Sequence, residues 1–125
     1  MDNNILSKNF TRQEIQCRCG CGANDISMDL IARLQEVRES LGQSMRITSG
    51  VRCRPHNHMV GGSEKSSHLV GNATAVDIAC DNSRYRQKLL KAMMPVFDRV
   101  GISGKNGFIH CDVDPNKTAE VVWLY

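Results

Sequence analysis

The sequence has few aromatic residues, no dense basic cluster and no long apolar run. Aromatic side chains make up 5% of the 125 residues, and the net charge of +3 comes from scattered Lys and Arg. A nucleic-acid module concentrates basic residues and supplies aromatic ones, so we expect no nucleic-acid partner. No segment approaches the roughly 20 apolar residues that span a bilayer, so we expect no membrane insertion.

A secretory signal is also missing, since residues 1–9 have neither a basic start nor an apolar core. We therefore expect synthesis in the cytoplasm. There is no internal repeat, and with 41% hydrophobic and 23% charged residues the composition is that of an ordinary globular protein. The length predicts one domain over residues 1–125, which we expect to be a monomer. The weak positive charge implies only a mild attraction to anionic polymers such as cell wall.

The chain has six cysteines. Without an export signal, these are expected to be reduced thiols or metal ligands rather than disulfides. Cys17, Cys19 and Cys21 are separated by single residues, whereas paired zinc cysteines are usually separated by two or more. A second metal site formed by these three and Cys53 is therefore the less favoured interpretation. A tight glycine-rich loop with buried thiols is the favoured one.

Hydrophobic periodicity predicts two main helices. Apolar residues recur at steps of three and four between Ser27, a good N-cap, and Gly42, a good stop. A second such helix is predicted over residues 83–94. Shorter helices are predicted after Thr11, which has a capping-box Glu three residues later, and at Arg54, which is followed by proline.

Alternating or β-rich segments predict strands, mostly in the second half of the chain. They are residues 45–49, 75–79, a hairpin over 100–113 and a last strand at 120–124. The predicted class is α+β, with a mostly antiparallel sheet.

Two distant segments have the composition of a divided zinc site. His68 and Asp77 would supply two ligands and His110 the third, which leaves one tetrahedral position open for water. Three protein ligands plus water is the catalytic pattern of zinc. Since alternate residues of a strand share a face, Asp112 would project beside His110. It could accept a proton from the water or orient a ligand, and the sequence leaves both roles open.

These motifs, in this order, resemble the zinc D-alanyl-D-alanine carboxypeptidases and related peptidoglycan peptidases, a family that includes phage endolysins. The resemblance extends over nearly the whole chain. It is carried by the following segments: Ser66-x-His68-x-x-Gly71-x-Ala73, Asp77, Phe108-Ile109-His110-x-Asp112, residues 48–57, residues 60–62 and residues 10–22.

The resemblance implies a hedgehog-like fold, in which a mostly antiparallel sheet of about four strands is flanked by helices and carries the metal on its open face. It makes His68, Asp77 and His110 the ligands of one catalytic zinc ion. It also makes Arg52 the catalytic group that grips and positions a substrate carboxylate, and it places the Ser66 hydroxyl against the substrate peptide.

The chain differs from the family pattern at two places. Two more residues than usual lie between His68 and Asp77, and Gly107 occupies the position where many relatives carry an acidic catalytic residue. Asp112 is then the best candidate for the general base.

The resulting hypothesis is a zinc metallopeptidase that hydrolyses an amide bond in peptidoglycan stem peptides, next to D-alanine. Two alternatives are an L-alanyl-D-glutamate endopeptidase of the same family and a zinc-containing cell-wall-binding module without turnover. A phage-type protein released from the cytoplasm by a separate pore would reach such a substrate.

Overall fold

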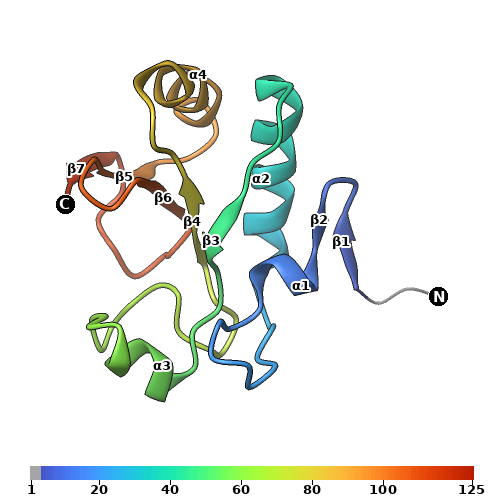
Figure 1. Cartoon of the computed structure of the whole chain (residues 1–125), viewed down its shortest axis with the longest axis vertical. Coiled ribbons are helices and arrows are strands. Elements are labelled where there is room, and N and C mark those ends of the chain that lie inside the picture. The colour runs from blue at the N-terminus through green and yellow to red at the C-terminus, as the bar shows by residue number, and fades with distance from the viewer. Residues whose placement is uncertain (1–3) are drawn as a thin grey trace.

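The structure, a computed structural model, describes residues 4–125 and has the predicted α+β architecture (Figure 1). Its helices and strands are, in order, β1 (Ile5–Ser7), β2 (Phe10–Thr11), α1 (Arg12–Ile15), α2 (Met28–Leu41), β3 (Ile47–Ser49), α3 (Arg54–Met59), β4 (Ala75–Ala79), α4 (Ser83–Met93), β5 (Arg99–Ser103), β6 (Phe108–Asp112) and β7 (Val121–Leu124).

The main sheet has five strands in the order β3-β4-β6-β5-β7. It is mostly antiparallel and contains the five strands that the sequence pattern predicts, one more than the resemblance implies, and β5 and β7 run parallel. The parallel pair has a simple origin. β6 is antiparallel to β5, so a chain that reverses after β6 and joins the free edge of β5 must run in the direction of β5.

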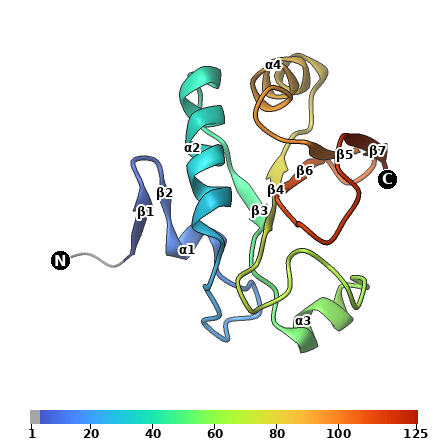
Figure 2. The ribbon, with the colours of Figure 1, turned by 180° about the vertical axis from the view of Figure 1, so that it is seen from behind.

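A separate hairpin, β1–β2, was not predicted from the sequence. Its strands of three and two residues are too short to show a period. The hairpin lies on the outer side of α2, away from the main sheet (Figure 2). There the Ser7 hydroxyl donates a hydrogen bond of 2.7 Å to Gln35 Oε1.

Helices α2 and α4 pack side by side against one face of the sheet and form the core with it (Figure 1). Both have the caps that their sequences predict. Ser27 Oγ accepts from the backbone N–H of Leu30, and Gly42 ends α2 in the left-handed conformation at φ 69°. The Asn82 side chain accepts from Tyr85 N–H at the start of α4.

Strand alternation separates an apolar face of the sheet from a polar one. On β4, Val76 and Ile78 point into the core with Ile109 of β6, so the intervening residue, Asp77, points to the opposite face. The register pairs Asp77 with His110. The polar face is therefore set by the same pattern that builds the core.

The N-terminal segment braces the loop that follows β3. Thr11 caps α1 as predicted, and Phe10 and Ile15 are fully buried. Val51 N–H donates to Ile15 O at 2.8 Å. Gly50 lies so close to this segment that a Cβ atom on it would come within 2.4 Å of Ile15 O, so this contact requires glycine.

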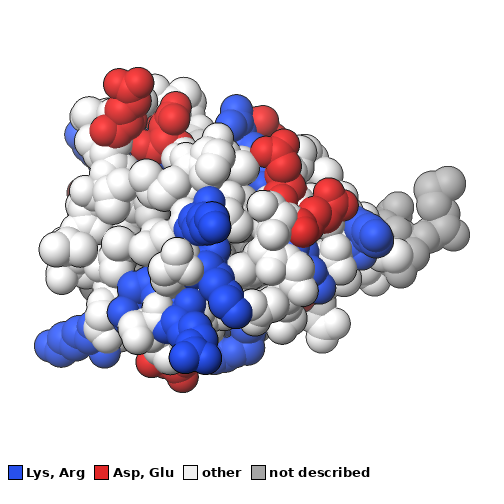
Figure 3. Space-filling model, turned by 90° about the horizontal axis from the view of Figure 1, so that it is seen from above, with Lys and Arg blue, Asp and Glu red and all other residues white. Residues whose placement is uncertain are grey.

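Positive charge gathers over one helix of the fold. Lys and Arg side chains gather over α4 when the molecule is seen from above (Figure 3). This helix carries Arg84, Arg86, Lys88 and Lys91 and no acidic residue. Among residues 4–125, no helix combines the length and apolar character required to cross a membrane.

Candidate active site

One row of paired residues crosses all five strands on the polar face of the sheet. Ser49 of β3 pairs with Asp77 of β4, which pairs with His110 of β6. His110 pairs with Gly101 of β5, and Gly101 pairs with Trp123 of β7. Two of the predicted ligands therefore lie side by side on neighbouring strands.

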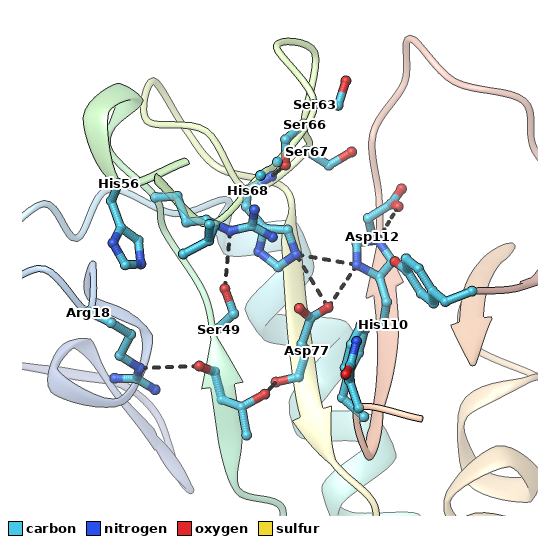
Figure 4. A pocket seen from close by; sticks show the side chains of 18 of the residues that line it. Arg18, Ser49, His56, Ser63, Ser66, Ser67, His68, Asp77, His110 and Asp112 are labelled. Atoms are coloured by element: carbon cyan, nitrogen blue, oxygen red, sulfur yellow. Dashed lines mark hydrogen bonds and ion pairs between the residues drawn. The ribbon is translucent and has the colours of Figure 1, made fainter. Parts of the chain in front are cut away.

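The third predicted ligand, His68, reaches this row from the loop between α3 and β4 (Figure 4). Its Nδ1 lies 2.7 Å from Gly50 O. Because a carbonyl only accepts, this contact assigns the proton to Nδ1 and leaves the lone pair on Nε2 facing Asp77 and His110. The backbone holds the residue as well, since Arg52 N–H donates to His68 O at 2.7 Å.

The three side chains converge on one point. His68 Nε2 lies 3.3 Å from His110 Nδ1 and 3.3 Å from Asp77 Oδ1, and His110 Nδ1 lies 2.9 Å from Asp77 Oδ1. Tetrahedral zinc with ligand bonds of about 2.0–2.1 Å places neighbouring ligand atoms about 3.3 Å apart. The spacing of the donor atoms therefore fits one zinc ion to within a few tenths of an ångström.

The cluster is buried, and burial affects the protonation of its members. Burial alone would raise the pKa of Asp77, but hydrogen bonds with His110 and His68 outweigh it and hold this pKa below its usual value. Burial lowers the pKa of His68, although Asp77 opposes the shift. At neutral pH Asp77 is therefore a carboxylate and His68 a neutral imidazole, the forms that bind metal ions.

Asp112 lies behind His110, on the side away from the three converging atoms (Figure 4). Its Oδ2 accepts from His110 Nε2 at 2.7 Å, and its Oδ1 accepts from Arg99 Nε at 2.8 Å and from Asp114 N–H at 3.1 Å. The side chain is 1% exposed. Of the two roles left open by the sequence, this geometry favours orienting His110 over accepting a proton from water.

Arg52 lines the same cavity as the cluster. Its Nη1 donates to Asn57 Oδ1 at 2.9 Å and its Nε to Ser49 Oγ at 3.3 Å, both neutral oxygens. It makes no ion pair within residues 4–125. Burial lowers the pKa of Arg52, while the charge of nearby Asp77 raises it. The guanidinium is thus a half-buried cation whose charge is available to an anionic ligand.

The sequence did not identify Asn57 as part of this arrangement. It is 4% exposed, and its Nδ2 donates to Ser63 O at 2.8 Å. A Cβ atom on Gly62 would lie 2.1 Å from Asn57 Oδ1, so the glycine pair at 61–62 leaves room for the amide that holds Arg52. A polar residue in a six-residue helix gives no sequence signal of burial.

The cavity around these groups has a volume of about 660 Å³, the size of a small-molecule or short-peptide site. Trp123 forms part of its wall, with its ring 5.3 Å from that of His110. Ser66 also lines the cavity, and its Oγ accepts from His68 N–H at 3.2 Å. The donor cluster, the Arg52 guanidinium and the Ser66 hydroxyl, all candidate site groups from the sequence, therefore line one cavity.

The sequence profile described as Peptidase M15 matches residues 8–112 of the chain. The chain belongs to the peptidase M15 family. This confirms the resemblance to the D-alanyl-D-alanine carboxypeptidase-like zinc peptidases and identifies the protein as a peptidase by family. The matched region contains the whole donor cluster and Arg52. No curated protein sequence matches the chain.

The segment between His68 and Asp77, which we expect to be two residues longer than in the family pattern, contains a turn. Gly71 and Asn72 both have positive φ, at 93° and 67°. Asn72 N–H donates to Asp25 Oδ2 and Ala73 N–H to Asp25 O, at 3.1 and 3.3 Å. These hydrogen bonds attach the turn to the residues before α2. Both ends of the segment, His68 and Asp77, lie in the cluster.

A second group of donor atoms lies beyond the cavity. The cysteines are free, and Cys17, Cys19, Cys21 and Cys53 have their sulfur atoms within 4.8 Å of one another. The expected loop of buried thiols is wrong for Cys19 and Cys21, which are exposed. This grouping was the less favoured interpretation because its single-residue spacing is unusual. The structure nevertheless assembles it.

Gly101 keeps Trp123 in place beside His110. A methyl group at this position would come within 2.6 Å of Trp123 Cε2. We expect Gly101→Ala to displace the ring, to change the fluorescence of the only tryptophan and to lower the free energy of unfolding by about 1–3 kcal/mol.

The matched control is Gly104→Ala, because an added Cβ there meets no atom within 4 Å. Its stability should stay within about 0.5 kcal/mol of the original protein. Equal urea midpoints and equal emission spectra for the two variants would contradict the assignment.

Proposed function

We propose that the chain is a zinc-dependent peptidase that hydrolyses an amide bond in the stem peptides of peptidoglycan. The observation that carries the proposal is the joint presence, in one cavity, of three donor atoms at tetrahedral spacing and a guanidinium without a carboxylate partner. Zinc held by His68, Asp77 and His110 would supply a Lewis acid for the scissile carbonyl and a water of lowered pKa.

Hydrogen bonds from neighbouring groups orient the two histidines of this centre in the absence of substrate. Gly50 O fixes the tautomer of His68, and Asp112 fixes that of His110. Such outer contacts hold metal ligands in orientation and raise their basicity. Asp77 contributes the negative charge that partly offsets a divalent cation. Three protein ligands would leave one tetrahedral position of a zinc ion for water, as in catalytic zinc sites.

Arg52 is proposed to bind a carboxylate of the substrate. Its planar fork suits two parallel hydrogen bonds to a carboxylate, and Asn57 and Ser49 restrain it from the other side. A terminal D-alanine places a carboxylate one carbon from the scissile nitrogen. This favours a D-alanyl-D-alanine carboxypeptidase activity, with Ser66 at the cavity wall as a hydrogen-bonding group for the peptide.

D-Glutamate linked through its side chain also offers a carboxylate next to its amide nitrogen. The same guanidinium therefore suits cleavage between L-alanine and D-glutamate, the second candidate activity. For either bond, the positive charge over α4 (Figure 3) supports attraction of the protein to the anionic polymers of the cell wall.

The activity is tested by digesting purified peptidoglycan with the zinc-loaded protein and weighing the fragments. Release of D-alanine identifies the carboxypeptidase, and new N-terminal D-glutamate identifies the endopeptidase. We expect His68→Ala and His110→Ala to reduce fragment release to the level of a blank digest. His58→Ala, at an exposed position of α3, should digest normally.

Two results would count against the proposal. Fragment release that survives both ligand substitutions would place the chemistry elsewhere. Stoichiometric zinc binding with no cleavage of any wall fragment across the pH range would identify a binding module instead of a peptidase.

Substitution of Arg52 tests the carboxylate contact. Lysine keeps the charge but loses the fork, and hydrogen bonds to charged groups are worth about 1.5–3 kcal/mol. We expect Arg52→Lys to lower kcat/KM roughly 10- to 100-fold. The exposed neighbour Arg54 provides the matched variant Arg54→Lys, which should leave kcat/KM unchanged. Equal effects of the two substitutions would remove Arg52 from substrate binding.

The role of Asp112 is tested by separating metal affinity from turnover. If Asp112 orients His110, Asp112→Asn should weaken zinc binding about 10- to 100-fold. Proton transfer then falls to another cavity side chain, and His56 is the other imidazole in the lining. His56→Gln should lower kcat and leave zinc affinity unchanged. An Asp112→Asn protein with normal zinc affinity and low kcat would restore Asp112 as the base.

A further inference from the structure

Four sulfur atoms meet at residues that do not line the peptidase cavity. Cys17 Sγ lies 3.5 Å from Cys19 Sγ and 3.7 Å from Cys53 Sγ, and Cys19 Sγ lies 3.6 Å from Cys53 Sγ. Cys21 completes the group, with all four sulfurs within 4.8 Å of one another. A disulfide has a bond of about 2.05 Å, so these are contacts between separate thiols.

The separations match those of a tetrahedral thiolate site. Zinc binds cysteine sulfur at about 2.3 Å, which places two sulfurs of a tetrahedron about 3.8 Å apart. The three shortest separations in the group, 3.5 to 3.7 Å, are close to this value.

The loop achieves the convergence through its glycines. Gly20 and Gly22 have positive φ, at 88° and 85°, and each follows a cysteine of the group. Cys17 N–H donates to Ala23 O at 2.8 Å and closes the base of the loop. The left-handed conformation of Gly20 and Gly22 reverses the chain direction after Cys19 and again after Cys21. These reversals allow sulfur atoms of cysteines separated by a single residue to face one centre.

Neighbouring groups support negative charge on the sulfurs. Cys53 N–H donates to Cys17 Sγ at 3.4 Å, a contact that stabilises a thiolate and orients it as a ligand. The positive charge of Arg52 lies close enough to interact with Cys17 and would offset part of the charge of a tetrathiolate centre.

We propose that Cys17, Cys19, Cys21 and Cys53 form a second metal site, a closed four-thiolate centre for Zn²⁺. It differs in kind from the centre at His68, Asp77 and His110. Four protein ligands leave no position for water or substrate, so the second ion has a structural role. The proposal uses none of the residues of the peptidase centre, and it can fail or succeed independently of the proposed function.

The structural role concerns the position of Arg52. Cys53 follows Arg52 directly and is the N-cap residue of α3. The metal would tie this point to the loop that follows α1, in addition to the hydrogen bond from Val51 N–H to Ile15 O. It would thereby fix both the guanidinium and, through the Arg52–His68 backbone contact, one side of the peptidase centre.

The test measures zinc and cobalt in the reduced, full-length protein and three variants. We expect two zinc ions per chain in the original protein. His68→Ala/His110→Ala should retain one ion, and its Co²⁺ form should show thiolate-to-cobalt charge-transfer absorption. Cys19→Ser/Cys21→Ser, at exposed positions, should retain one ion and lose that absorption.

Cys80→Ser is the matched control, because Cys80 is outside the group and should leave two ions bound. A single zinc ion per chain in the original protein, together with a Co²⁺ form of that protein that lacks thiolate bands, would overturn the proposal. So would a Co²⁺ form of His68→Ala/His110→Ala without thiolate bands, whether or not the cysteine variants fold.

Discussion

The register between β4 and β6 is the constraint on which the rest of the site depends. It places Asp77 opposite His110 on one face and Val76 and Ile78 in the core on the other. A slip of one residue would turn the carboxylate and the imidazole inward and the aliphatic side chains outward. Since α2 and α4 pack against the apolar face, burial of the core and pairing of the donors are the same event in folding. The chemistry is thus specified by hydrophobic packing far more than by attraction between the polar groups themselves.

Much of this could be predicted from the sequence, for identifiable reasons. The apolar steps of α2, its caps at Ser27 and Gly42, and the alternation in β4 and β6 are local patterns, and the structure confirms the elements they predicted. The convergence of His68, Asp77 and His110 is a long-range property. It was accessible only because the spacing and order of several motifs resembled a known family, and the structure brings the three together. Their roles remain part of the proposed function.

Other features depend on three-dimensional neighbours that no local pattern encodes. The parallel pairing of β7 follows from which sheet edge is free. Asn57 is buried because Gly62 leaves space beside it. Asp112 was left with two roles because the sequence cannot show that Arg99 and His110 occupy both of its oxygens. The cysteine group was given little weight because single-residue spacing is unusual, and only the backbone angles of Gly20 and Gly22 show how such a spacing closes.

The donor set is divided between two kinds of scaffold. Asp77 and His110 sit on hydrogen-bonded strands, whereas His68 belongs to the loop that also carries Ser66 and the turn at Gly71 and Asn72. An insertion in that loop would reshape the entrance to the cavity, while two of the three candidate ligands would keep their places on the sheet. The architecture therefore separates the part of the candidate site fixed by the sheet from the part that a change in loop length would alter.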